Sequence, residues 1–295
     1  MTQGAQDSSP IDARVRLPRE LRPADSPPHS GYTSRYDAVL ATETSGEKTC
    51  ADLLAEMQAA GVGGAVVHAE YEYGEVADAL NDAVARLVAD EPRFVAGIGT
   101  VSMLDAPPMR RVQQARGVAR LGLAGLNIQP SFFGLPIDDR SLYPLYTAAS
   151  EENLVVFVHT GVNYTAHRPI RNDHPLQLDQ VACDFPELRL VACHGGWPFV
   201  PEMVAVARKH PQVYLDFGGL APKYVGRPGT GWDALFAVMG SLLSRQVLFA
   251  TDWPVFPMDR ALREWRGVGL PDDTVQPLLR DNVSALLART ACPRW

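Results

Sequence analysis

Several features that mark common protein classes are missing from this chain of 295 residues. No GxGxxG or GxxxxGK[ST] motif follows its first predicted strand, which argues against a nucleotide-binding sheet. Its three lysines and net charge of -7 disfavour a broad basic surface for nucleic acid or an anionic membrane. No apolar run approaches the ~20 residues of a membrane span, and the opening MTQGAQDSSP is unlike a secretory signal.

Cysteine is also scarce: the four cysteines are widely spaced, and none forms a CxxC pair. We therefore expect free thiols in a reducing cytoplasm. The charge balance and the lack of a long apolar run predict no nucleic-acid or membrane partner. Hydrophobic residues make up 46% of the chain and charged residues 21%, which are values typical of globular domains.

Short β-branched runs alternate with longer helical patterns along the whole chain. Strands are predicted over 11–17, 62–69, 93–101, 124–129, 154–159, 188–194, 213–217 and 246–252. Helices are predicted over 49–60, 75–90, 107–120, 141–152, 176–184, 200–209, 232–243, 260–265 and 274–288. Such alternation implies parallel strands with crossover helices, and eight units predict a single-domain α/β fold, the (β/α)₈ TIM barrel. We place the barrel at 11–290, with a disordered tail at 1–10 and a C-terminal tail at 291–295.

One connection, over residues 18–48, is much longer than the others and rich in Pro, Gly, Ser and Thr. It follows the first strand, so a barrel would place it over the carboxyl ends of the strands, where active sites lie. We predict a lid over the site, with a disordered insert as the alternative.

Polar residues end three of the predicted strands. The run LVVFVH ends at His159, LRLVACH ends at His194, and VLFATD ends at Asp252. A strand end places a side chain at the mouth of a barrel. A single histidine there is usually structural, but three such residues at equivalent positions predict an active site.

Several segments, in this order, resemble the amidohydrolase superfamily. They are GLNIQP (125–130), LYPLYTAASEENLVVFVHTG (142–161), DFPELRLVACHGGWPFVPEMVAVARKHPQVYLDFGG (184–219), VLFATDWP (247–254) and DNVSALLA (281–288). The resemblance is to the amidohydrolase-related branch that includes aminocarboxymuconate-semialdehyde decarboxylases. It implies that His159 and Asp252 occupy metal-ligand positions, that His194 binds or acts on substrate, and that Asp252 also carries a proton.

The first strand departs from that family's pattern. The family opens with Ile-Asp-x-His-x-His, whose histidines ligate the metal, whereas this chain reads Ile-Asp-Ala-Arg-Val-Arg with Arg14 and Arg16 in their place. Strand alternation predicts that Asp12, Arg14 and Arg16 face the barrel interior while residues 11, 13, 15 and 17 face the helices.

Arginine is a hydrogen-bond donor only and repels a divalent cation. We therefore expect no cofactor, with zinc or manganese on His159, Asp252 and His194 as the alternative. Arg14 and Arg16 are predicted to supply the metal's positive charge and clamp a carboxylate or a developing oxyanion. The structural alternative is that they only form salt bridges with Asp12 and Asp252.

A second group of residues is predicted to contact substrate around these five. Its members are Asp12, His68, Glu70, Tyr71, Asn127, Gln129, Trp197 and Trp253. The tryptophans could equally pack beneath loops.

The predicted function is an enzyme acting on a small carboxylated or cyclic, lactone-like molecule, without a metal, by hydrolysis or a related proton transfer. The chain also resembles the 2-pyrone-4,6-dicarboxylate lactonase branch, which implies that such a barrel can work without metal. One alternative is a metal-dependent decarboxylase or hydrolase, and another is a catalytically retired barrel that binds a ligand or partner. Related barrels often pair, so a homodimer is also expected.

Overall fold

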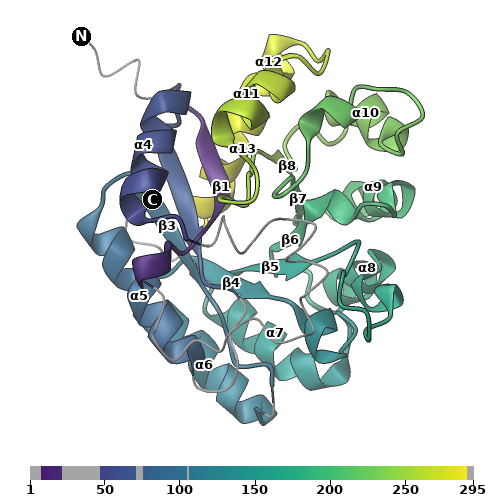
Figure 1. Ribbon diagram of the computed structural model, residues 1–295. Helices are drawn as coiled ribbons and strands as arrows, with labels where there is room; N and C mark the ends of the chain where they lie inside the picture. The colour runs from purple at the N-terminus through teal and green to yellow at the C-terminus, as the bar shows by residue number, and fades with distance from the viewer. Residues whose placement is uncertain (1–7, 22–46, 71–75, 105, 291–295) are drawn as a thin grey trace.

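All eight predicted strands form one parallel sheet in the order β1 to β8, and ten α-helices of the described part of the chain lie around it in the computed structural model (Figure 1). The structure describes residues 8–21, 47–70, 76–104 and 106–290. The strands are β1 (Ile11–Arg16), β2 (Gly64–His68), β3 (Phe94–Gly99), β4 (Gly125–Ile128), β5 (Val155–His159), β6 (Leu190–Cys193), β7 (Val213–Asp216) and β8 (Val247–Leu248). This is the predicted (β/α)₈ barrel.

The helices cover the outside of the barrel, as the alternating pattern predicted. They are α4 (Cys50–Ala60), α5 (Val76–Asp90), α6 (Pro108–Arg120), α7 (Tyr143–Glu151), α8 (Leu176–Asp184), α9 (Val200–Lys209), α10 (Asp233–Met239), α11 (Met258–Arg266), α12 (Asp272–Gln276) and α13 (Asn282–Leu287). The helix predicted over 274–288 is present, but its middle is a π-helical turn at Pro277–Asp281 that joins α12 to α13.

Local sequence explains where individual helices begin and end. At the start of α4, the Thr49 side chain accepts from the Asp52 amide while the Asp52 carboxylate accepts from the Thr49 amide. This reciprocal cap satisfies two helix-end donors. Gly61 ends the helix with a positive φ of 72°, a conformation that glycine adopts without steric cost.

The barrel closes through hydrogen bonds between β1 and the segment that continues β8. Ala13 donates to the Phe249 carbonyl, Asp252 donates to the Arg14 carbonyl, and each N–O distance is 2.9 Å. The β1–β2 register shifts between Asp12 and Val15, which is a bulge. Beyond a bulge, side chains that regular alternation would place on one face of the sheet lie on the other face.

Because of this bulge, the prediction that residues 11, 13, 15 and 17 all face the helices is wrong. Ile11 and Ala13 belong to an inner apolar cluster that draws residues from seven of the eight strands and from Ala124, just before β4, whereas Val15 and Leu17 pack in the larger cluster between strands and helices. The four do not share one face. Because the alternation restarts after the bulge, Arg14 and Arg16 reach the interior above the inner cluster.

The long connection after β1 is described only at its ends. Residues Arg19–Leu21 form a 3₁₀ turn, and the Arg19 amide donates to the Lys48 carbonyl at 3.1 Å, so the two ends lie side by side. The predicted lid falls largely on residues 22–46, which lie outside the described residues, as do 1–7 and 291–295 of the predicted tails. Among the described helices, none is long and apolar enough to cross a membrane.

Candidate active site

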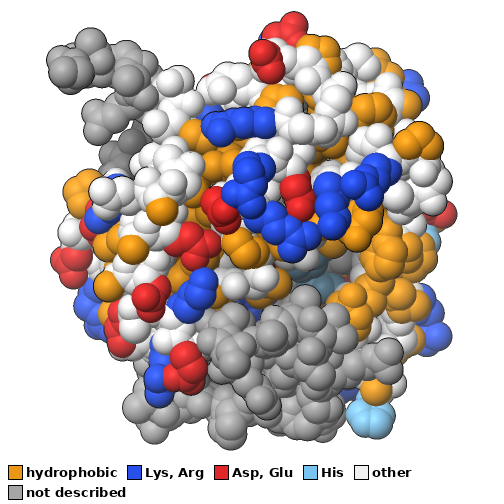
Figure 2. All heavy atoms as spheres, turned by 45° about the horizontal axis from the view of Figure 1, so that its top comes forward, with side chains coloured by type: hydrophobic (Ala, Val, Ile, Leu, Met, Phe, Trp, Pro, Cys, Tyr) orange, Lys and Arg blue, Asp and Glu red, His pale blue; other side chains and the backbone are white. Residues whose placement is uncertain are grey.

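The three residues that end predicted strands meet at the carboxyl ends of the barrel. His159 is the last residue of β5, His194 follows β6, and Asp252 lies four residues after β8. All three line one cavity of about 70 Å³. Figure 2 shows Lys and Arg side chains gathered around a hollow on one face of the molecule, with histidine visible inside it. The predicted convergence at one mouth is therefore present.

Two of these residues have an unusual backbone conformation. His194 has a φ of 61° and Asp252 a φ of 57°, in the left-handed region that non-glycine residues seldom occupy. Residues held in such conformations cost about 1–3 kcal/mol each and cluster at functional sites. The strained backbone aims both side chains toward the cavity instead of continuing the strand.

His159 is held by a carboxylate that the sequence did not reveal. Its Nδ1 lies 2.7 Å from Oδ1 of Asp173, a fully buried residue that ends the 3₁₀ turn Ile170–Asp173. Because Nδ1 donates to Asp173, the other ring nitrogen, Nε2, is left for the cavity. The only sequence signal was its place in a loop after β5.

His194 is also oriented by its surroundings. Its Nδ1 donates to the Gly218 carbonyl at 2.7 Å, and its backbone amide donates to the Asp216 carboxylate at 3.2 Å. Burial, together with the neighbouring His159 and Arg14, lowers the pKa of His194 to about 4. At neutral pH this imidazole is therefore uncharged, with Nε2 able to accept a proton.

Both arginines of the first strand bind Asp252. Arg14 Nε and Arg16 Nε lie 3.1 and 3.0 Å from its Oδ1, and Arg16 Nη2 lies 2.6 Å from its Oδ2. Glu70 completes the cluster: its Oε1 lies 2.5 Å from Arg14 Nη2 and its Oε2 lies 3.1 Å from Arg16 Nε. Arg14 Nη1 also lies 3.9 Å from Asp216 Oδ2. Two guanidinium groups thus share three carboxylates in a buried network, and Glu70, not Asp12, is the second partner of both arginines.

The two arginines decide the protonation of Asp252. Burial by itself would raise the pKa of this carboxyl, but Arg16 and then Arg14 outweigh burial and hold it well below its usual range. Asp252 is consequently ionised at neutral pH. Arg14 also donates to Cys193 Sγ at 3.1 Å, although burial still keeps the pKa of that thiol well above normal.

Three of the predicted substrate contacts have structural partners. Asp12 accepts from the backbone amides of Arg14 and Thr251, each at 3.0 Å, and from the Thr251 hydroxyl. His68 Nε2 donates to the Ala13 carbonyl at 2.9 Å, and burial lowers its pKa well below normal. Asn127 donates to the Ala69 carbonyl and accepts from Arg14. These residues support the arginine cluster and do not line the cavity.

The two tryptophans have different positions. Trp197 lines the cavity and is 37% exposed. Trp253 is 1% exposed, and its Nε1 donates to Glu56 Oε2 at 3.0 Å, so it packs toward α4. Gln129 is buried, and its Oε1 has no hydrogen-bond partner among the described residues. Tyr71 lies outside the described residues.

The remaining walls of the cavity were missed by sequence reasoning. They are formed by Phe132, Val162, Tyr164, Gly219 and Leu220. Loop residues such as these carry no periodic signal, so only the folded chain brings them together. A side chain at Gly219 would put its Cβ 3.6 Å from Asp252 Oδ2 and 3.9 Å from His194 Nδ1. Glycine therefore leaves the space beside these two groups open.

Comparison with known proteins gives the family. Residues 11–291 match the model of the amidohydrolase family. A stretch of 213 residues, 62% of this chain and 57% of the relative, is 29% identical to 2-amino-3-carboxymuconate-6-semialdehyde decarboxylase from Dictyostelium discoideum. The chain thus matches less than two thirds of that relative's length. An uncharacterised TIM-barrel protein from Bordetella bronchiseptica is 26% identical with a TM-score of 0.77, covering 95% of this chain and 99% of that one.

The expectation of no cofactor is contradicted by a further structural neighbour. A 5-carboxyvanillate decarboxylase from Novosphingobium aromaticivorans was crystallised with manganese and 4-hydroxy-3-methoxy-5-nitrobenzoic acid. It is 15% identical with a TM-score of 0.70, covering 97% of this chain and 98% of that one. A barrel of this fold can therefore hold a divalent metal, and the expectation of no cofactor, which rested on Arg14 and Arg16, is wrong as stated.

The mouth of this chain, as it is arranged, does not fit such an ion. Both carboxylate oxygens of Asp252 already accept from guanidinium groups. A group of three side chains that can share one metal ion has its ligand atoms within 4.8 Å of one another. Within the described part of the chain, His159, His194 and Asp252 do not form such a group. We therefore derive no chemical step through a metal at this position. The match over residues 11–291 and the barrel with its strand-end His, His and Asp show that the chain belongs to the amidohydrolase family.

Proposed function

We propose that this protein is a lyase that decarboxylates a small, preferably aromatic, carboxylate. The observation that carries the proposal is the composition of the cavity. Ionised Asp252 and two histidines lie beside two guanidinium groups, and Phe132, Tyr164 and Trp197 form aromatic walls. Arg16 can bind a substrate carboxylate by exchanging one of its present partners, Asp252 or Glu70, and the aromatic walls suit a planar ring. The relatives named as decarboxylases support this reading above the hydrolase or lactonase that the sequence suggested.

Decarboxylation breaks one carbon–carbon bond. Carbon dioxide leaves, the electron pair stays on the substrate carbon, and a proton must be delivered there. In the unliganded protein Asp252 is ionised and is therefore a proton acceptor, not a donor. A substrate carboxylate that pairs with Arg16 competes with Asp252 for the guanidinium. Losing that partner raises the pKa of Asp252, so that the carboxylate takes up a proton from solvent and can deliver it to the substrate carbon.

The two histidines flank this exchange. Their ring centroids are 5.0 Å apart, and His159 also meets Phe132 edge to face at 5.1 Å. With Nδ1 of each ring committed to Asp173 or Gly218, each Nε2 is left for the cavity. We assign His159 and His194 to orienting the substrate and relaying the proton, and Arg14 to holding Asp252 and Glu70 in place.

The test is a panel of ortho-hydroxylated aromatic carboxylates, assayed for carbon dioxide release with and without added Mn²⁺. Lactones are assayed in parallel for ring opening. We expect carbon dioxide from at least one carboxylate and no lactone hydrolysis. Asp252→Asn should abolish turnover while the protein still binds an aromatic carboxylate, because the amide cannot carry the proton. Lactone hydrolysis without decarboxylation would refute the proposal.

A further inference from the structure

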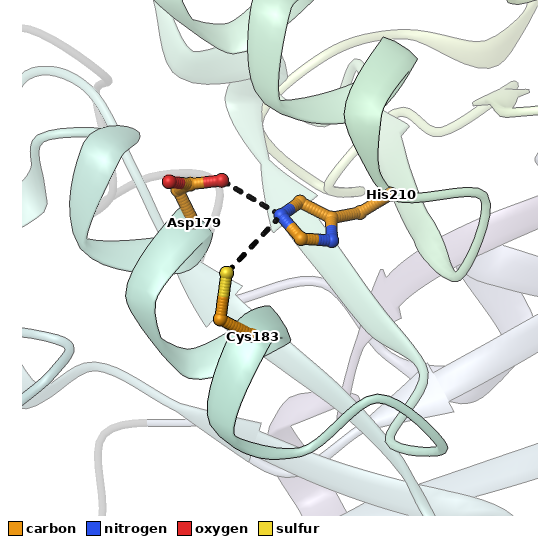
Figure 3. Close-up of side chains that lie close together, drawn as sticks. All are labelled: Asp179, Cys183 and His210. Carbon is orange, nitrogen blue, oxygen red and sulfur yellow. Dashed lines mark hydrogen bonds and ion pairs between the residues drawn. The ribbon is translucent and has the colours of Figure 1, made fainter.

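Three potential metal ligands of different chemistry meet on the outside of the barrel, away from the cavity. Asp179 and Cys183 lie four residues apart on α8, and His210 follows directly after α9 (Figure 3). One donor atom from each comes within 4.8 Å of the other two. His210 Nε2 lies 2.7 Å from Asp179 Oδ1 and 4.0 Å from Cys183 Sγ, so both contacts converge on the same ring nitrogen.

The fold places this group on the face opposite the candidate active site. Helix α8 leads into β6, and His210 precedes β7, so the cluster lies by the amino-terminal ends of these strands. The cavity, by contrast, lies at the carboxyl ends. Conserved or specialised residues at the amino-terminal face of such barrels act on stability and not on catalysis.

The cluster is preorganised. The i, i+4 spacing puts Asp179 and Cys183 on one face of α8. The His210 backbone is anchored, because its amide donates to the Val206 carbonyl at 3.0 Å and its carbonyl accepts from the Gln246 side chain at 3.2 Å. The His210 side chain is only 10% exposed, whereas Cys183 is exposed, so a cation can reach the thiol from solvent.

A cationic side chain already contacts two members of the group. Lys209 Nζ lies 2.7 Å from Asp179 Oδ1 and 3.5 Å from Cys183 Sγ. The lysine side chain is 55% exposed, so it can move out into solvent when a metal ion competes for these atoms. Its position shows that these atoms attract positive charge and that a metal ion would compete with the ammonium group.

We propose that Asp179, Cys183 and His210 form a second cation site, for Zn²⁺, that links α8 to the α9–β7 junction. Sulfur, imidazole and carboxylate are together the ligand set that zinc accepts, with water as the fourth ligand. On binding, Lys209 swings out, the thiol proton goes to solvent, and the imidazole proton moves from Nε2 to Nδ1. The site is structural and is independent of the proposed decarboxylase activity.

The test measures Zn²⁺ binding to the whole protein by competition with a chromophoric chelator, and Co²⁺ binding by its sulfur-to-metal absorption. Cys183→Ser and His210→Gln should each weaken Zn²⁺ binding at least about tenfold, since even outer partners of metal ligands are worth that much. Cys50→Ser, which changes a cysteine on α4, should not. Lys209→Met should strengthen binding, because it removes the competing charge.

Thermal unfolding gives a second readout. Zn²⁺ should raise the melting temperature of the wild type by a few degrees, but not that of Cys183→Ser, because only the folded site binds. The proposal is overturned if Cys183→Ser binds Zn²⁺ and Co²⁺ as the wild type does, or if Lys209→Met leaves the affinity unchanged or lowers it. These two surface variants decide the question even if His210→Gln fails to fold.

Discussion

Replacing Arg14 by Met should destabilise the barrel substantially, because Arg14 is the buried centre of the charge cluster. The residue is 1% exposed, and its guanidinium contacts Asp252, Glu70, Asn127 and Cys193. Methionine fills most of the stem but leaves Asp252 and Glu70 with Arg16 as their shared counter-charge, and it removes the ion pair with Asp216. Removing one partner of a buried ion pair costs about 3–5 kcal/mol. For a chain of this size, 4 kcal/mol corresponds to a fall in melting temperature of about 6 °C.

The assay is thermal unfolding at neutral pH, followed by circular dichroism. Arg116→Met is the control, since its ion pair with Glu151 is exposed and should be worth less than about 1 kcal/mol. The double variant Arg14→Met with Glu70→Gln should recover part of the loss, because one uncompensated charge is gone. If Arg14→Met melts within about 1 °C of the control, the cluster does not stabilise the fold as argued.

Four further predictions concern single positions and assembly. Asp173→Asn should lower kcat about ten- to a hundredfold with little change in KM, since a charge-assisted hydrogen bond of about 1.5–3 kcal/mol no longer fixes the His159 ring; steady-state kinetics that match the wild type would make Asp173 a purely structural residue. Burial raises the pKa of Asp12 to about 7, so the folded state holds this proton more tightly than the unfolded state, and Asp12 makes stability fall as pH rises from about 4 to 7. Urea unfolding across that range should therefore show the free energy of unfolding of Asp12→Asn rising relative to that of the wild type as the pH approaches 7. If the two free energies change in parallel with pH, the pKa of Asp12 is not raised. Arg16→Lys should weaken binding of an aromatic carboxylate about tenfold in calorimetry, because lysine keeps the charge and loses the fork; unchanged affinity would remove Arg16 from the binding site. Light scattering should give the mass of a homodimer, and a monomer at all working concentrations would contradict that.

The sequence predicted the barrel because its signal is local and repeated. Each strand is a short β-branched run and each helix has its own apolar periodicity, so eight units could be recognised one at a time. The same logic located His159, His194 and Asp252, since the end of a parallel strand is also the mouth of the barrel. The sequence also predicted that Arg14 and Arg16 stand where the family resemblance implies two histidines, and this stays a prediction.

Tertiary structure alone decided what those residues contact. The bulge between Asp12 and Val15 is a pairing irregularity between two strands, and no pattern within one strand predicts it. Asp173 reaches His159 across 14 positions of irregular chain, and Glu70 reaches Arg14 across 56. Such contacts depend on where loops pass, which side-chain periodicity does not encode. For the same reason, the meeting of Asp179, Cys183 and His210 could not be seen in the sequence: two helices packed side by side on the barrel bring these three side chains together.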